Sequence, residues 1–138
     1  MKKLKVESQA IANVTIPVSF KDSVNVGKWV SKNNVNKAII KLEKVLTHEL
    51  ALPMRTFNTN IPHKRGLGFG GRYPKNVCKY VIKTLNLLKA NAKAKGLDTS
   101  KLILNQFIAN YAVSKNKRAR YKTGRSTHLM VGAVVKND

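Results

Sequence analysis

The sequence predicts an α+β domain: three helices packed on a small antiparallel three-stranded sheet, with a projecting β-hairpin. Strand-like segments occur once before and twice after three amphipathic segments. This order is typical of helices that cover one face of an antiparallel sheet. The last two strand-like segments, Leu102–Tyr111 and Thr127–Val135, bracket a basic segment without an acid. The chain must leave one strand and return to the other, so this segment is expected to project as a hairpin.

The first strand is expected over residues 14–20, because apolar residues alternate there at Ile16, Val18 and Phe20. Pro17 favours an edge position, since proline cannot donate to a central ladder. Residues 1–13 are polar and basic, and are expected to form an extension that lies on a partner.

The first two helices follow directly. The first is expected to be capped by Asp22 or Ser23 and to end near Asn33. The second is expected over residues 35–50, with Asn34 as its cap. Its apolar residues fall on one helical stripe: Val35, Ala38, Ile39, Leu42, Val45 and Leu46.

The third helix is expected over residues 74–95, with Pro74 in its first turn and Gly96 as its C-terminal cap. Lysines recur every four residues along one side of it: Lys75, Lys79 and Lys83. Like charges at this spacing destabilise a helix by roughly a few tenths of a kcal/mol each. Because no glutamate is interleaved, a ridge that faces phosphate is favoured over a merely solvated face.

A long loop is expected over residues 54–72. Its glycines let the backbone approach a surface closely. It is not read as a nucleotide-binding loop, because no predicted strand precedes it and no Gly-Lys-Ser/Thr follows. The loop carries five cationic or titratable residues and no acid: Arg55, His63, Lys64, Arg65 and Arg72.

Composition narrows the class of partner. The 138 residues include 27 Lys and Arg against six acids, a formal net charge of +21. Such an excess points to a polyanionic partner, with nucleic acid the first candidate and an anionic membrane surface the second. No apolar run is long enough to span a membrane. The single Cys78 excludes an internal disulfide and fits a reducing compartment. One domain, 1–138, is expected.

The hairpin arm, about 112–127, concentrates this charge. Its cations are Lys115, Lys117, Arg118, Arg120, Lys122 and Arg125. They would repel one another in isolation, so the arm is expected to lie against polyanion. Tyr121 sits among them, and His128 follows where the arm rejoins the sheet; both suit stacking or phosphate contacts.

No signal for an enzyme, a cofactor or a metal is found. The acids are scattered, and the histidines lack partners at metal-ligand spacing. Cys78 and Trp29 are expected in the core. Aromatic residues beside cations could stack on unpaired bases: Phe57, Phe69, Tyr73, Tyr111 and Tyr121. For Phe57 and Phe69, anchoring the loop to the domain is an equally good interpretation.

A set of short motifs resembles a known family. The chain resembles the universal large-subunit ribosomal protein family numbered twenty-two in bacterial naming and seventeen in eukaryotic naming, in its archaeal and eukaryotic cytosolic branch. The residues that carry the resemblance occur in the family's order and spacing: Lys37-Ala38, Leu42, Lys44-Val45, Leu52-Pro53-Met54-Arg55, Gly71-Arg72-Tyr73-Pro74, Asn91-Ala92, Lys95-Gly96-Leu97-Asp98, Arg118, Gly124-Arg125 and Thr127-His128.

The resemblance implies a structural, non-catalytic constituent of the cytoplasmic large ribosomal subunit. It implies contact with large-subunit rRNA near the peptide exit, with neighbouring ribosomal proteins, and with nascent peptide near the hairpin tip. No membrane partner and no homo-oligomer are expected. Two departures stand out: Lys93 replaces a usual acid, and only Ser126 separates Arg125 from Thr127, so a shortened hairpin is expected.

Charge, loop and resemblance together define the expected rRNA-binding residues: Arg55, His63, Lys64, Arg65, Arg72, Lys75, Lys79, Lys83, Lys115, Lys117, Arg118, Arg120, Tyr121, Lys122, Arg125 and His128. The alternative is an architectural DNA-binding protein with a basic β-arm in the minor groove. Such arms usually come from dimers and carry an apolar wedge near the tip, where this sequence offers only Tyr121.

Overall fold

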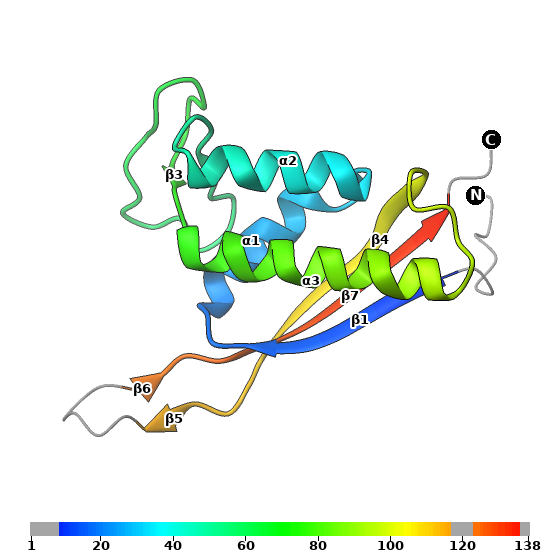
Figure 1. The fold of residues 1–138 in the computed structure, drawn as a ribbon. Helices are drawn as coiled ribbons and strands as arrows, with labels where there is room; N and C mark the ends of the chain where they lie inside the picture. Colours follow the sequence, from blue (N-terminus) through cyan, green and yellow to red (C-terminus); the bar gives the residue numbers. More distant parts are fainter. Residues whose placement is uncertain (1–8, 117–122, 136–138) are drawn as a thin grey trace, which may run out of the picture.

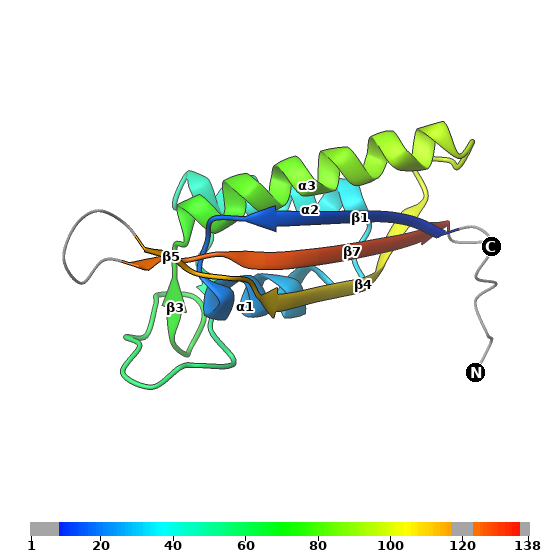
Figure 2. The same cartoon turned by 90° about the horizontal axis from the view of Figure 1, so that it is seen from below.

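Three helices cover one face of a three-stranded antiparallel sheet, which confirms the predicted α+β architecture (Figures 1 and 2). The structure is a computed structural model that describes residues 9–116 and 123–135. The sheet has the order β1-β7-β4. Its strands are β1 (Gln9–Ile16), β7 (Thr127–Val135) and β4 (Leu102–Tyr111).

The two C-terminal strands have the predicted bounds, and β7 forms the centre of the sheet. Leu129, Val131 and Ala133 alternate toward the helices and are buried, as the period-two pattern requires. The register between β4 and β7 shifts between Leu104 and Gln106, so Asn105 is the extra residue of a β-bulge. Two short pairs complete the strands: β2 (Leu52–Pro53) with β3 (Gly71–Arg72), and β5 (Lys115–Asn116) with β6 (Thr123–Gly124).

The first strand lies earlier in the chain than predicted. It covers residues 9–16 rather than 14–20, and pairs with β7 along its whole length. Residues 9–13 therefore belong to the sheet and not to an extension. The buried side of this part consists of Ala10 and Ala12, whose small side chains give a weak strand signal. Residues 1–8 lie outside the described part of the chain.

The first helix, α1 (Phe20–Val30), also begins earlier than predicted. Its N-cap is Ser19, and the expected caps Asp22 and Ser23 lie inside the first turn. Ser23 is buried and donates from its hydroxyl to the Ser19 carbonyl at 2.8 Å. Gly27 lets this helix approach the sheet closely, because a β-carbon there would collide with the ring of Phe107 on β4.

The second helix begins at its predicted residue, whereas the third begins one residue later than predicted, so Pro74 is its N-cap and does not lie in its first turn. In α2 (Val35–Leu46), the side chain of Asn34 accepts from the Asn36 N–H at 2.9 Å, which confirms the predicted cap. This helix ends four residues early, where His48 has a φ of 64°. The third helix, α3 (Lys75–Ala94), ends before Gly96, whose φ of 68° confirms the predicted glycine cap.

Both outer edges of the sheet are covered at the end away from the arm. On β1, the side chains of Asn91 and Lys95 donate to the carbonyls of Ile11 and Gln9, each at 2.9 Å. On β4, the loop between the first two helices pairs with the backbone. There the Lys32 N–H donates to the Leu104 carbonyl at 2.9 Å.

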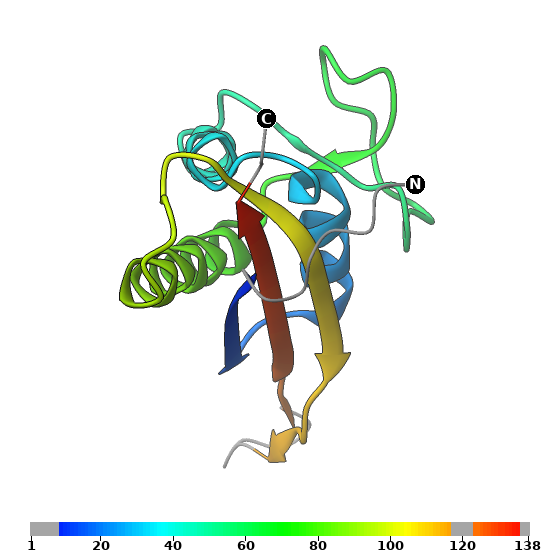
Figure 3. The ribbon, with the colours of Figure 1, turned by 90° about the vertical axis from the view of Figure 1, so that its right-hand side faces the viewer.

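At the opposite end, β5 and β6 continue past β4 and β7 and carry the arm beyond the sheet (Figures 1 and 3). The Ala112 N–H donates to the Ser126 carbonyl at 3.2 Å and joins the outgoing and returning segments at the root of the arm. Buried Thr127 donates from its hydroxyl to the Val18 carbonyl at 2.9 Å. The turn between β1 and α1 is thereby fixed beside the arm.

Candidate nucleic-acid interface

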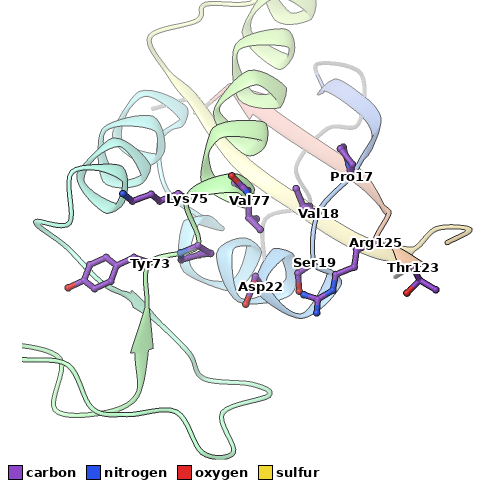
Figure 4. A pocket seen from close by; sticks show the side chains of 11 residues that line it. Pro17, Val18, Ser19, Asp22, Tyr73, Lys75, Val77, Thr123 and Arg125 are labelled. Atoms are coloured by element: carbon purple, nitrogen blue, oxygen red, sulfur yellow. The ribbon is translucent and has the colours of Figure 1, made fainter. Parts of the chain in front are cut away.

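Three distant chain segments meet at the root of the arm and enclose a hollow of about 670 Å³. The segments are the turn before α1, the first turn of α3, and the returning chain of the arm. Lys75, Arg125 and Asp22 line this hollow, and Figure 4 shows the side chain of Lys75 pointing away from the other two. Both cations are exposed, so they are available to an anion in solvent.

A second hollow, of about 390 Å³, adjoins the first and is lined by Lys64 and Arg72. The two hollows share Asp22, Tyr73 and Pro74. We name the continuous surface formed by Lys64, Arg72, Lys75 and Arg125 the arm-root surface. The four cations come from the long loop, from β3, from α3 and from the arm, so the fold brings together residues that are separated in the sequence.

Two helices begin at this surface. Neither Ser19, before α1, nor Pro74, before α3, caps its helix with a side chain. The first-turn N–H groups of a helix are unpaired within it and favour negative charge. In α1 the carboxylate of Asp22 lies in that first turn. In α3 the first turn holds no acid, so its N–H groups add positive potential to that of Lys75.

The long loop is held on α1 by one buried side chain that sequence reasoning did not single out. Asn25 is 1% exposed. Its Oδ1 accepts from the N–H groups of Arg55 and Thr56 at 3.1 and 3.0 Å, and its Nδ2 donates to the Thr56 carbonyl at 2.9 Å. An asparagine between the apolar Val24 and Val26 was the available signal, because a buried amide requires partners.

The loop folds back on itself rather than remaining irregular throughout. Its ends pair through β2 and β3, and Ile61 is nearly buried beneath it. Gly66 and Gly68 have φ values of 86° and 69°, a left-handed conformation that glycine adopts without strain. His63 and Arg65 are exposed on this loop.

One of the two phenylalanines of the loop contacts the domain. The guanidinium of Arg55 lies 5.8 Å from the ring centre of Phe69, and Phe57 packs edge-on against Phe20 at 6.2 Å. The anchoring interpretation thus has a direct contact for Phe57, whereas the contact of Phe69 with Arg55 lies within the loop; stacking on bases stays a prediction for both. Arg55 is not part of the arm-root surface, because it lines a separate hollow with Trp29. Trp29 is half-buried there rather than in the core.

The lysine ridge of α3 extends away from the arm-root surface. Lys75, Lys79 and Lys83 are all exposed, and Lys83 lies 5.6 Å from the ring centre of Tyr80. Of the three, only Lys75 lines the hollow at the arm root. The ridge has the expected exposure, and its contact with phosphate stays a prediction.

The arm begins as predicted, with β5 paired to β6. Lys115 lies in β5, and Arg125 follows β6. The remaining arm residues of the expected site lie outside the described residues: Lys117, Arg118, Arg120, Tyr121 and Lys122.

His128 does not join the other candidates. It lies on the face of the sheet away from the helices, and its Nδ1 is 2.7 Å from the hydroxyl of Thr15. Its neighbours across the ladders are Thr15 and Asn110. It therefore adds no charge to the arm-root surface.

The described residues offer little for catalysis. They contain no group of three or more potential metal-ligating side chains. Cys78 is fully buried, as expected, and desolvation together with the charge of Asp22 raises the pKa of its thiol to about 12; a neutral thiol is a poor nucleophile. In the described part of the chain, no helix has the length and apolar character required to cross a membrane.

A small α+β domain with cations around two adjoining hollows and a protruding basic arm is typical of polyanion-binding proteins. Comparison with known families agrees. Residues 11–131 match the family described as ribosomal protein L22p/L17e, and the chain belongs to this family. The resemblance found in the sequence motifs is thereby confirmed, and the family consists of ribosomal structural proteins rather than enzymes.

Three similar relatives, two archaeal and one eukaryotic, are each named as a large ribosomal subunit protein, uL22 or uL22A. The relative from Archaeoglobus fulgidus is 36% identical over 91 residues, covering 64% of this chain and 59% of its own. That from Nanoarchaeum equitans is 32% identical over 128 residues, covering 84% and 72%. That from Saccharomyces cerevisiae is 36% identical over 112 residues, covering 78% and 61%. The matches thus span from about three fifths to under three quarters of these relatives' lengths.

Proposed function

We propose that the chain is a structural constituent of the large ribosomal subunit that binds large-subunit rRNA. Membership of the L22p/L17e family carries this proposal. The arm-root surface supports it, because cations from four chain segments line its two adjoining hollows beside the start of α3. Backbone phosphates dominate the affinity of such surfaces, whereas the shape of the folded RNA supplies specificity.

The finer parts of the proposal concern placement. The whole chain acts as one domain whose arm, about 112–127, is directed to the nascent-peptide tunnel near the peptide exit. The two-residue pairing of β5 with β6 supports a short arm of this kind. Its partners are rRNA, neighbouring ribosomal proteins and, near the tip, nascent peptide. The protein works as a single copy in the cytoplasm, without a membrane partner.

The test is sedimentation of cell lysate on a sucrose gradient with detection of this chain. We expect the chain in the large-subunit, whole-ribosome and polysome fractions, and we expect it to stay there at moderate salt. Dissociation of ribosomes by removal of Mg²⁺ should move it to the large-subunit peak. Recovery with chromatin would favour the architectural DNA-binding alternative, and recovery in the free fraction would contradict both.

A further inference from the structure

Two aromatic rings stack where the arm leaves the sheet. Tyr111 is the last residue of β4, and Phe20 is the first residue of α1. Their ring centres are 3.9 Å apart with an interplanar angle of 26°. Despite this contact, Tyr111 is 69% exposed. A ring that stacks through one face and remains this exposed has its other face available to a ligand.

The stacked pair borders a hollow of about 240 Å³. Lys21 and Arg125 also line it, together with the small residues Ser19 and Ser126. This volume is below the roughly 300–1,000 Å³ of drug-sized ligand pockets, so it suits one flat ring rather than a whole nucleotide. Arg125 lines the arm-root hollow as well, so the aromatic hollow adjoins the proposed phosphate-binding surface.

We propose that this hollow binds one unpaired RNA base, stacked on Tyr111, with the adjoining phosphates on Lys21 and Arg125. The inference rests on the proposed function and adds a recognition element to it: a single-stranded nucleotide at the root of the arm. Unpaired bases commonly stack on aromatic or guanidinium planes, whereas a continuous duplex hides its base faces. The flanking cations favour an RNA base over an apolar peptide, because they match the phosphates on either side of a base.

A purely structural role for Tyr111 would be to hold the arm against α1. That role requires only the contact between Tyr111 and Phe20. Phe20 is itself held in place by the edge-on contact with Phe57. The structural role explains neither the exposure of the tyrosine ring nor the presence of Arg125 at the hollow, whereas Lys21 also lies 5.5 Å from the ring centre of Phe57. The two roles also differ in what they predict for paired and unpaired RNA.

The experiment compares two probes, an oligouridylate and a poly(A)·poly(U) duplex, on the full chain. We expect Tyr111→Leu to weaken binding of the oligouridylate by roughly five- to 150-fold, the range for loss of one stacked base. Binding of the duplex should stay within about twofold, since the phosphate contacts remain. Tyr111→Phe keeps a ring and should retain binding of both probes.

Ile108→Ala is the matched control, because Ile108 is a 40% exposed apolar residue on the same strand that does not line the hollow. It should leave both affinities unchanged, and thermal unfolding should show all three variants folded. An equal loss on both probes would overturn the proposal in favour of arm positioning. No loss on either would overturn it too. Failure of the unmodified chain to bind either RNA would instead contradict the proposed function itself.

Discussion

Asn25 of α1 and Thr56 of the long loop are joined by three hydrogen bonds. The Thr56 N–H and hydroxyl both donate to the amide oxygen of Asn25 at 3.0 Å, and the Asn25 amide donates back to the Thr56 carbonyl at 2.9 Å. The same amide also donates to the Lys21 carbonyl. One buried side chain thus fixes the loop that carries Lys64 and Arg72, half of the arm-root surface.

Asn25→Ala should destabilise the fold and loosen the loop. It leaves the N–H groups of Arg55 and Thr56 without their acceptor, and an unsatisfied buried group costs about 1–3 kcal/mol. The unfolding temperature should fall by several degrees, measured by circular dichroism. Asn86→Ala, at an exposed position of α3, is the control and should change it little. An equal, small change in both variants would show that Asn25 does not hold the loop.

Replacement of Lys75, Lys79 and Lys83 by Gln should reduce the salt dependence of RNA binding while leaving α3 folded. Each neutralised phosphate contributes a slope of about −0.7 to −0.9 in log K against log salt, so the slope should become shallower by about two units. Fluorescence anisotropy across a salt series measures it. Lys37→Gln with Lys44→Gln, both exposed on α2, provides a control for general loss of charge. An unchanged slope would place the ridge in solvent.

The arm cations should contribute to docking and not to folding. Gln at five of the six should leave the melting temperature of the free protein unchanged or slightly raised, because no acid lies between residues 112 and 127 to pair with them. Incorporation into subunits should fall, with Arg118 and Arg125 mattering most, since guanidinium binds phosphate in bidentate fashion. The changed residues are Lys117, Arg118, Arg120, Lys122 and Arg125. A lower melting temperature with normal incorporation would be evidence against the arm as an RNA-docking element.

Stability should fall with alkaline pH partly through Cys78. Its pKa is raised from 9.0 to about 12 in the folded protein, so only the unfolded chain releases the thiol proton between these values. The contribution of the protonated Cys78 thiol to the free energy of unfolding is fully present below about pH 9. Above that pH it is lost at up to about 1.4 kcal/mol per pH unit. Urea unfolding from pH 8 to pH 10.5, compared with Cys78→Ala, isolates this effect. Parallel pH profiles for the two proteins would contradict it.

The segments with strong periodicity could be predicted from the sequence. The two C-terminal strands, the cap at Asn34 and the stop at Gly96 agree with the structure. The bounds of the first strand could not be predicted, because its buried residues Ala10 and Ala12 have small side chains that give a weak strand signal. The apolar Val18 and Phe20, which suggested a strand, instead pack from a turn and from the start of a helix.

The individual residues of the candidate site could be predicted from the sequence, but their arrangement in space could not. Charge alone identified Lys64, Arg72, Lys75 and Arg125, yet only the fold shows that they share adjoining hollows. His128 looked equivalent in the sequence and lies on another face. Tyr111 and Phe20 stack across a sequence separation that no local pattern reports.

The covered edges of the sheet affect how readily the free protein, before it binds a partner, can aggregate through its strands. An open strand edge is a template on which a second copy can add, and is therefore a route to aggregation. Here Asn91 and Lys95 bond the outward carbonyls of one edge strand, and the loop at Lys32 pairs with the other. Asn91 and Lys95 lie in two of the short motifs that carry the resemblance of the sequence to the family. These contacts leave fewer unpaired backbone groups on which a second copy could add, a role separate from any contact with RNA.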